Sequence, residues 1–164
     1  MSNQADVSLR WNQGRDVIED MLHRTQSALT KVQPSREHAD RLIRQARAHL
    51  TTAAGVADDD PAGAYSMVYD AARKALVAVL ENQGLRPTQR GGHLAAYEAV
   101  SAQLDPPLGK TLKPFTRLRR NRNDSEYPAT DDEEISSEQV LEDLPKAAAI
   151  VDLAATVLDR MRAY

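Results

Sequence analysis

Hydrophobic residues recur at spacings of three and four along most of the chain, which is the period of helices with one buried face. The first such stretch predicts a helix from about Asn12 to Lys31, ended by Pro34. Ser35 is a suitable N-cap for a second helix, whose apolar positions are Ala39, Leu42, Ile43, Ala46 and Leu50. These stretches are expected to form an N-terminal helical pair within residues 1–57.

The next predicted helix has the clearest core pattern in the chain. It starts after the acidic run Asp58 to Asp60, with Pro61 in its first turn, and Gly84 ends it. One stripe is apolar, formed by Tyr65, Val68, Ala72, Leu76, Val79 and Leu80. On the polar side Tyr69 and Arg73 lie one turn apart, as do Asp70 and Lys74. These polar side chains either form weak ion pairs or line a cleft.

The remainder of the chain contains three further predicted helices. The polar loop GLRPTQRGGH leads into a short helix through Leu94, Tyr97, Val100 and Leu104. After DPPLG, another helix begins near Leu108 and ends before Pro128. Ser136 and Gln139 then have the spacing of a capping box. The last helix repeats apolar residues close to a heptad, so it packs within the bundle or against a second copy, and Pro145 kinks it or marks its true start.

These elements predict an all-α, up-and-down helical bundle of about five to six helices in a single domain, residues 1–164, with a core over residues 58–164. Composition agrees, because 41% hydrophobic residues suffice for a core and only 4% aromatic residues argue against a β-sandwich or barrel. The absence of cysteine excludes disulfides and thiolate metal sites. No membrane-spanning run and no signal-peptide pattern occurs, which predicts a cytoplasmic protein that does not bind membranes.

Charge is strongly separated along the chain despite a net charge of only -3. Eight Lys or Arg lie between Arg86 and Arg122, whereas the segment from Asn123 to Leu144 carries nine Asp or Glu and no Lys or Arg. Three interpretations are open. The basic segment forms a phosphate site with the acidic segment as a gate beside it, or the two segments neutralise each other across the fold, or they are solvated helix faces followed by an acidic loop.

The segment from Arg117 to Pro128, RLRRNRNDSEYP, has chemistry beyond what folding requires, because four arginines fall within six residues. On a helix, Arg122 and Glu126 share a face with Phe115 and Leu118. An arginine on this face points toward a packed seam, where a guanidinium is costly unless it meets an anion or lines a cleft. Arg122 is therefore the leading candidate for function.

The histidines give weaker signals. His93 follows Gly91 and Gly92 near a helix start, where backbone can approach a ligand closely, although the position favours a structural or exposed role over a functional one. The other histidines are isolated along the helices, so no metal and no cofactor is expected.

Three segments, YSMVYDAARKALVAVLENQGLRP, GGH and RRNRNDSEYP, resemble the HEPN superfamily over roughly Pro61 to Tyr164. The family signature is an Arg, usually followed by a polar residue, with a His a few positions further on. In members that are metal-independent ribonucleases, two such motifs meet across a dimer. Arg122 and Asn123 match the start of the motif, whereas the histidine position falls on Tyr127.

The replacement of histidine weakens the expectation of nuclease activity. Metal-independent cleavage needs proton transfer near neutral pH and a cation to stabilise the charged phosphorane. Tyrosine, with an ordinary pKa of ~10, is a poor base at neutral pH. Glu126 is either a base or, more simply, the ion-pair partner of Arg122. Candidates for catalysis are Arg122, Asn123, Glu126 and Tyr127, and candidates for binding phosphate or another ligand are Arg117, Arg119, Arg120, Arg122, His93, Asp70 and Arg73.

Three hypotheses follow for function. The first is a dimeric RNA- or nucleotide-binding module of toxin-antitoxin or defence type, with a degenerate nuclease motif. The second is an active metal-independent ribonuclease toxin. The third is a structural or protein-interaction bundle whose arginines pair with the acidic loop. The family resemblance further implies a homodimer and a nucleotidyltransferase partner, for which Tyr127 is a candidate modification target.

Overall fold

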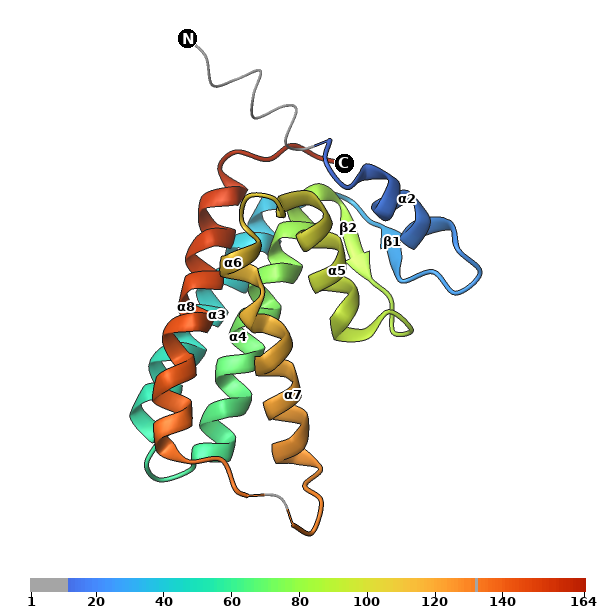
Figure 1. Cartoon of the computed structure of the whole chain (residues 1–164). Helices are drawn as coiled ribbons and strands as arrows, with labels where there is room; N and C mark the ends of the chain where they lie inside the picture. Colours follow the sequence, from blue (N-terminus) through green and yellow to red (C-terminus); the bar gives the residue numbers. More distant parts are fainter. Residues whose placement is uncertain (1–11, 132) are drawn as a thin grey trace.

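The computed structural model describes residues 12–131 and 133–164. Four helices lie side by side and form the long arm of the molecule (Figure 1). They are α3 (Arg36–Val56), α4 (Pro61–Gln83), α7 (Pro114–Glu126) and α8 (Ser137–Leu158). The prediction of an all-α bundle is confirmed.

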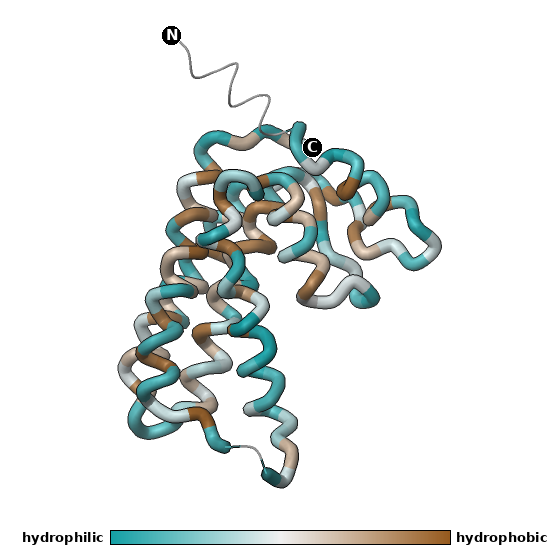
Figure 2. The backbone as a smooth tube through the Cα atoms, viewed as in Figure 1, coloured by the Kyte–Doolittle hydropathy of each residue, from teal (hydrophilic) through white to brown (hydrophobic). Residues whose placement is uncertain are grey.

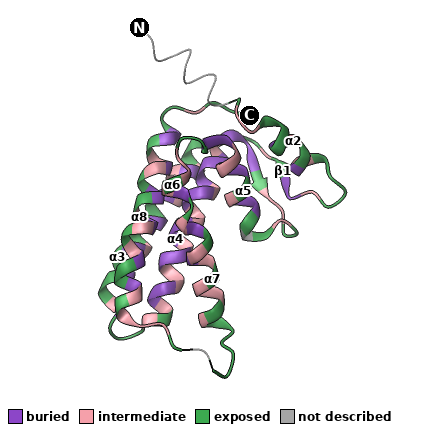
Figure 3. Ribbon diagram, in the orientation of Figure 1, coloured by how far each residue is buried: buried purple, intermediate pink, exposed green. Residues whose placement is uncertain are grey.

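Helix α4 is the central helix of the bundle. Asp60 caps it by accepting a hydrogen bond of 3.0 Å from the Gly63 amide, and Gly84 ends it with φ +86°. The buried surface of α4 extends well beyond the predicted stripe (Figure 3), because its alanines let α3 and α8 pack closely around it. The predicted division between residues 57 and 58 falls in the turn between α3 and α4, and it stays a prediction.

A smaller group of elements crosses one end of the long arm (Figure 1). It comprises α2 (Arg15–His23), β1 (Leu29–Lys31), β2 (Leu85–Pro87), α5 (Gly92–Leu104) and the short α6 (Gly109–Leu112). The prediction of one helix from Asn12 to Lys31 is wrong, because the helix ends at His23 and Leu29–Lys31 forms a strand. The predicted loop after Gly84 likewise begins with a strand, and β1 and β2 pair antiparallel with Leu29 opposite Pro87. This pairing depends on distant contacts that a helical period cannot reveal.

The predicted helix from Leu108 is divided in two. Helix α6 ends at Leu112, and α7 starts at Pro114, which lacks an amide hydrogen and therefore suits the first turn of a new helix. Leu112, Phe115 and Leu118 are all buried, so this side of the segment faces the core as predicted. The lower half of α7 is strongly hydrophilic (Figure 2).

Helix α8 begins with the predicted capping box of Ser136 and Gln139. Pro145 lies inside the helix and does not mark its start. The buried residues of α8 pack against α3 and α4, so its apolar seam is used within the chain. Across residues 12–131 and 133–164, no helix combines the length and apolar character needed to cross a membrane.

Candidate functional site

Arg122 lies at the seam between α4 and α7. Its side chain is 25% exposed, and its Nη2 atom is 3.1 Å from Oε1 of Glu126. Its guanidinium carbon is 5.4 Å from the centre of the Tyr69 ring, within the range of a cation–π contact. Nη1 also donates to Oδ1 of Asn123 at 3.3 Å. The arginine is therefore held against α4 by neighbours on both helices.

The contacts of Arg122 leave one of its hydrogen-bond donors without a partner among the described residues. Its Nε atom is buried and has no hydrogen-bond partner in the described part of the chain. A buried donor without an acceptor costs about 1–3 kcal/mol, whereas a solvent-exposed ion pair contributes only about 0–1 kcal/mol. The ion pair with Glu126, the contact with Tyr69 and the hydrogen bond to Asn123 help to offset this cost, but none of them supplies an acceptor for Nε.

Tyr69 connects Arg122 to two other arginines. Burial raises the pKa of its hydroxyl to about 12, although the positive charges of Arg119, Arg73 and Arg122 act in the opposite direction. Tyr69 is therefore neutral at pH 7. We call Arg73, Arg119 and Arg122 the arginine cluster. Arg119 forms no ion pair with any of the described residues, unlike Arg117 and Arg122 on the same helix.

Stacked aromatic rings support this part of the seam. The ring centres of Tyr69 and Phe115 are 5.5 Å apart, and Tyr97 stacks on Phe115 at the same separation of 5.5 Å. These contacts link α4, α5 and α7 at distances favourable for aromatic pairs. Tyr69, which contacts Arg122, is therefore packed firmly against the core.

Asp70 ties the cluster to a further group of polar side chains. It accepts a hydrogen bond of 2.6 Å from Arg73, and its second oxygen is 3.2 Å from both Lys74 and His49. Burial raises the pKa of the Asp70 carboxyl, but the hydrogen bonds and charges of Arg73 and Lys74 outweigh it, so the pKa is lowered from its ordinary value. The predicted ion pair of Asp70 with Lys74 is therefore present, Arg73 pairs with Asp70 and not with Tyr69, and one positive charge of this group remains in excess.

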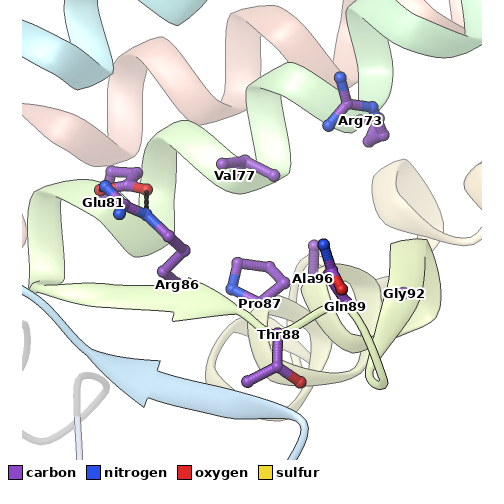
Figure 4. Close-up of a pocket in the computed structure, with 9 residues that line it drawn as sticks. All are labelled: Arg73, Val77, Glu81, Arg86, Pro87, Thr88, Gln89, Gly92 and Ala96. Carbon is purple, nitrogen blue, oxygen red and sulfur yellow. Dashed lines mark hydrogen bonds and ion pairs between the residues drawn. The ribbon is translucent and has the colours of Figure 1, made fainter.

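Arg73 also lines a pocket of about 400 Å³ between α4, β2 and α5. Figure 4 shows Arg73 at one end and the pair of Glu81 and Arg86 at the other, with Val77 and Pro87 between them. Glu81 is 3% exposed, and Nε of Arg86 donates to its Oε1 at 2.6 Å. Arg73 therefore both forms an ion pair and lines a cleft, so both alternatives given for the polar side of α4 apply to it.

The arginines of α7 diverge. Arg117 faces α8, with Nη2 3.5 Å from Asp143 and 3.9 Å from Glu142. Arg120 is exposed and has no ion pair within the described residues. The structure therefore brings Arg119 and Arg122 together with Arg73, and it does not bring Arg117 or Arg120 into this group.

Two other predicted residues lie on α5 and at the end of α7. Tyr127 caps the C-terminal end of α7 and is 79% exposed, and its side chain makes no hydrogen bond within the described residues. His93 lies in the first turn of α5, but its side chain is outside the part of the structure that is described.

A buried polar network positions α7. Asp143 of α8 is fully buried and accepts hydrogen bonds from the Tyr65 hydroxyl at 2.8 Å and from Lys146 at 3.0 Å. Asn121 of α7 donates to the same tyrosine oxygen at 3.1 Å. Three helices thus meet at Tyr65. Asn121 is a close neighbour of Arg119 and Arg122 in α7, so the network helps to set where the arginine cluster lies.

The sequence did not identify Tyr69, Lys74, His49 and Arg86 as site residues. The one-turn spacings of Tyr69 and Arg73 and of Asp70 and Lys74 were the local signals for part of this group. Lys74 reaches Asp70 within α4, whereas His49 meets Asp70 only because α3 packs along α4.

A second pocket, of about 320 Å³, lies between α3 and α8. There Arg36 is already paired with Asp40 at 2.8 Å and with Asp159 at 2.6 Å, and Arg47 approaches Asp152 at 3.5 Å. The arginine cluster on α4 and α7 is less fully neutralised, which makes it the stronger candidate for binding an anion.

Comparison with known proteins identifies the family. A family model described as the HEPN domain matches residues 39–158. No curated protein and no solved structure matches the chain. The matched range contains the whole of α4 and α7 and begins inside α3, earlier than the resemblance around Pro61 indicated. Because the match covers most of the chain, the protein belongs to the HEPN domain family.

Proposed function

We propose that this HEPN domain binds RNA by placing backbone phosphates on Arg73, Arg119 and Arg122. The observation that carries the proposal is Arg122, whose guanidinium lies 5.4 Å from the centre of the Tyr69 ring and whose buried Nε has no acceptor among the described residues. Arg73 and Arg119 are near enough for their charges to lower the pKa of the same tyrosine. Guanidinium groups match phosphate oxygens in geometry and charge. An incoming phosphate would compete with Glu126 for Arg122 and would find Arg119 already available.

The surroundings of Arg122 favour binding without cleavage. Proton transfer at neutral pH needs a group that titrates near 7 beside the reacting phosphate. Tyr69 has a pKa of about 12, and Glu126 is held in an ion pair by Arg122. Tyr127, at the position of the family histidine, is 79% exposed and has no described contact with Arg122. The side chain of His49 contacts Asp70 and Lys74 instead.

The expected binding site covers only a few phosphates. The chain has a net charge of -3, and the segment after Arg122 is strongly acidic, so extended electrostatic contact with RNA is unfavourable. Three phosphate contacts on single-stranded RNA predict a slope of log affinity against log salt of about -2. Affinity is therefore modest and falls steadily as salt is raised.

Fluorescence anisotropy with a short, labelled single-stranded RNA tests the proposal. Arg119→Ala and Arg122→Ala are each expected to weaken binding and to make the salt slope shallower by about 0.7, since each removes one contact. Arg120→Ala is the matched control, because it removes the same charge from the exposed side of the same helix. Circular dichroism establishes that each variant is folded.

Two outcomes would overturn the proposal. Equal weakening by Arg120→Ala and Arg119→Ala would show non-specific attraction in place of a site at the α4–α7 seam. Cleavage of the RNA without metal, lost in Arg122→Ala, would favour the ribonuclease hypothesis. A denaturing gel of the same samples detects cleavage directly.

The predicted homodimer, toxin-antitoxin or defence context and nucleotidyltransferase partner rest on the family resemblance. The 79% exposure of Tyr127 supports its role as a modification target, since a modifying enzyme must reach the hydroxyl. Native mass spectrometry of the purified protein measures the oligomeric state, and co-expression with a candidate transferase followed by peptide mass spectrometry tests modification of Tyr127.

A further inference from the structure

The pocket between α4, β2 and α5 adjoins the arginine cluster through one shared residue. Arg73 contributes positive charge near Tyr69 and also forms one end of the pocket (Figure 4). Asp70 holds the Arg73 guanidinium through hydrogen bonds from Nε at 2.9 Å and Nη2 at 2.6 Å. A phosphate at the arginine cluster therefore lies next to the mouth of the pocket.

The pocket has apolar walls between polar ends. Val77, Pro87 and Ala96 line its middle, and they offer surfaces on which a flat ring can lie. At the end away from Arg73, Glu81 supplies carboxylate oxygens and the half-exposed Arg86 supplies N–H donors. Donors and acceptors side by side suit the edge of a nucleobase. The volume of about 400 Å³ is within the range of about 300–1,000 Å³ that is usual for ligand pockets.

We propose that this pocket holds the base of one unpaired nucleotide whose phosphate is bound at Arg73. The inference rests on the proposed binding of RNA phosphates by the arginine cluster, and it adds the class of RNA that is recognised. The base lies between Val77 and Pro87, and its polar edge meets Glu81 and Arg86. The domain is therefore selective for single-stranded RNA.

Selectivity for single strands follows from the depth at which the base must enter. Bases inside an A-form duplex are stacked and paired, so proteins read duplex RNA mainly through its shape, hydroxyls and phosphates. An unpaired nucleotide can turn its base away from the strand and into a pocket. Duplex RNA still reaches the arginine cluster through its phosphates, but it loses the contribution of the pocket.

The test compares three RNA probes of equal length: a single strand, the same strand with abasic residues, and its duplex. Burial of one base against the apolar walls of the pocket removes enough apolar surface from water that the wild-type protein should bind the abasic strand and the duplex about fivefold or more weakly than the intact strand. Val77→Phe fills the pocket and should weaken binding of the intact strand by a similar factor, while binding of the abasic strand stays unchanged. Leu141→Phe, at a 51% exposed position of α8, is the matched control.

The outcomes separate this inference from the function on which it rests. Equal binding of intact and abasic strands by the wild-type protein overturns the pocket proposal, and this measurement does not depend on any variant. If Arg119→Ala still weakens both strands in that case, phosphate binding stands alone. If Arg119→Ala and Arg122→Ala change neither strand, the proposed function fails and the pocket proposal fails with it. Thermal melting shows whether Val77→Phe is folded.

Discussion

Asp143 is expected to be the most sensitive polar position in the bundle. It is fully buried, and its carboxylate accepts a hydrogen bond of 2.8 Å from Tyr65 and one of 3.0 Å from Lys146. Arg117 lies 3.5 Å away. Replacing Asp143 with alanine removes the group at which helices α4, α7 and α8 meet, so the variant should be strongly destabilised.

The size of the effect follows from what each partner loses. The bond from Tyr65 to a buried carboxylate is charge-assisted and contributes about 1.5–3 kcal/mol. Lys146 and Arg117 are 34% and 42% exposed, so water can solvate them after the change, and their pairs contribute about 0–1 kcal/mol each. Tyr65 keeps the bond from Asn121, but its own hydroxyl hydrogen loses its acceptor. We expect Asp143→Ala to lower the free energy of unfolding by about 3 kcal/mol.

Urea unfolding at pH 7, followed by far-ultraviolet circular dichroism, measures this loss. Asp152→Ala is the control, because Asp152 lies on the same helix, is 76% exposed and reaches Arg47 only at 3.5 Å. Its effect should stay within about 0.5 kcal/mol. A double-mutant cycle with Tyr65→Phe should give a coupling of about 1 kcal/mol or more. A loss no larger for Asp143→Ala than for Asp152→Ala, or zero coupling, would refute the reasoning.

Three further changes test other parts of the fold. The folded-state pKa of Asp70 lies below its ordinary value of 3.8, so its contribution to stability is full above that value and is lost as pH falls through the folded-state pKa. In urea unfolding at several pH values, the stability difference between wild type and Asp70→Asn should therefore be largest near neutral pH and should shrink as the pH falls below about 4. A difference that stays constant with pH would contradict this. Gly84→Ala should lower the free energy of unfolding by about 1 kcal/mol or more, because φ is +86° and a Cβ would lie 2.8 Å from the Val32 carbonyl oxygen. Gly55→Ala is the contrasting change, since a Cβ at this position of α3 meets open space, and it should raise the free energy of unfolding by about 0.5–1 kcal/mol. Ser136→Ala should lower the melting temperature by removing about 1 kcal/mol of capping, and no change would indicate that the first turn of α8 frays without cost.

Much of the fold was predictable because helix formation and capping are local. Local signals predicted several helix ends correctly. These signals are the proline that follows Asp60, the glycine at position 84 and the capping box of Ser136 and Gln139. The position of Arg122 could also be predicted locally, because its spacing from the buried Phe115 and Leu118 places it on the side of the helix that faces a packed seam. The helical period failed where distant segments pair: Leu29–Lys31 became a strand because β2 lies beside it.

The sequence by itself determined most of the helices, several of their caps, the family and the arginine that faces the seam. Only the tertiary structure decided what that arginine meets. The packing of α7 on α4 joined Arg119 and Arg122 to Tyr69 and Arg73, and the turn of the chain after Gly84 brought Pro87 and Arg86 opposite Val77 to enclose a pocket. Periodicity and capping report the neighbours within one helix, whereas a binding site is assembled from side chains on several elements, and their approach depends on how the whole core packs.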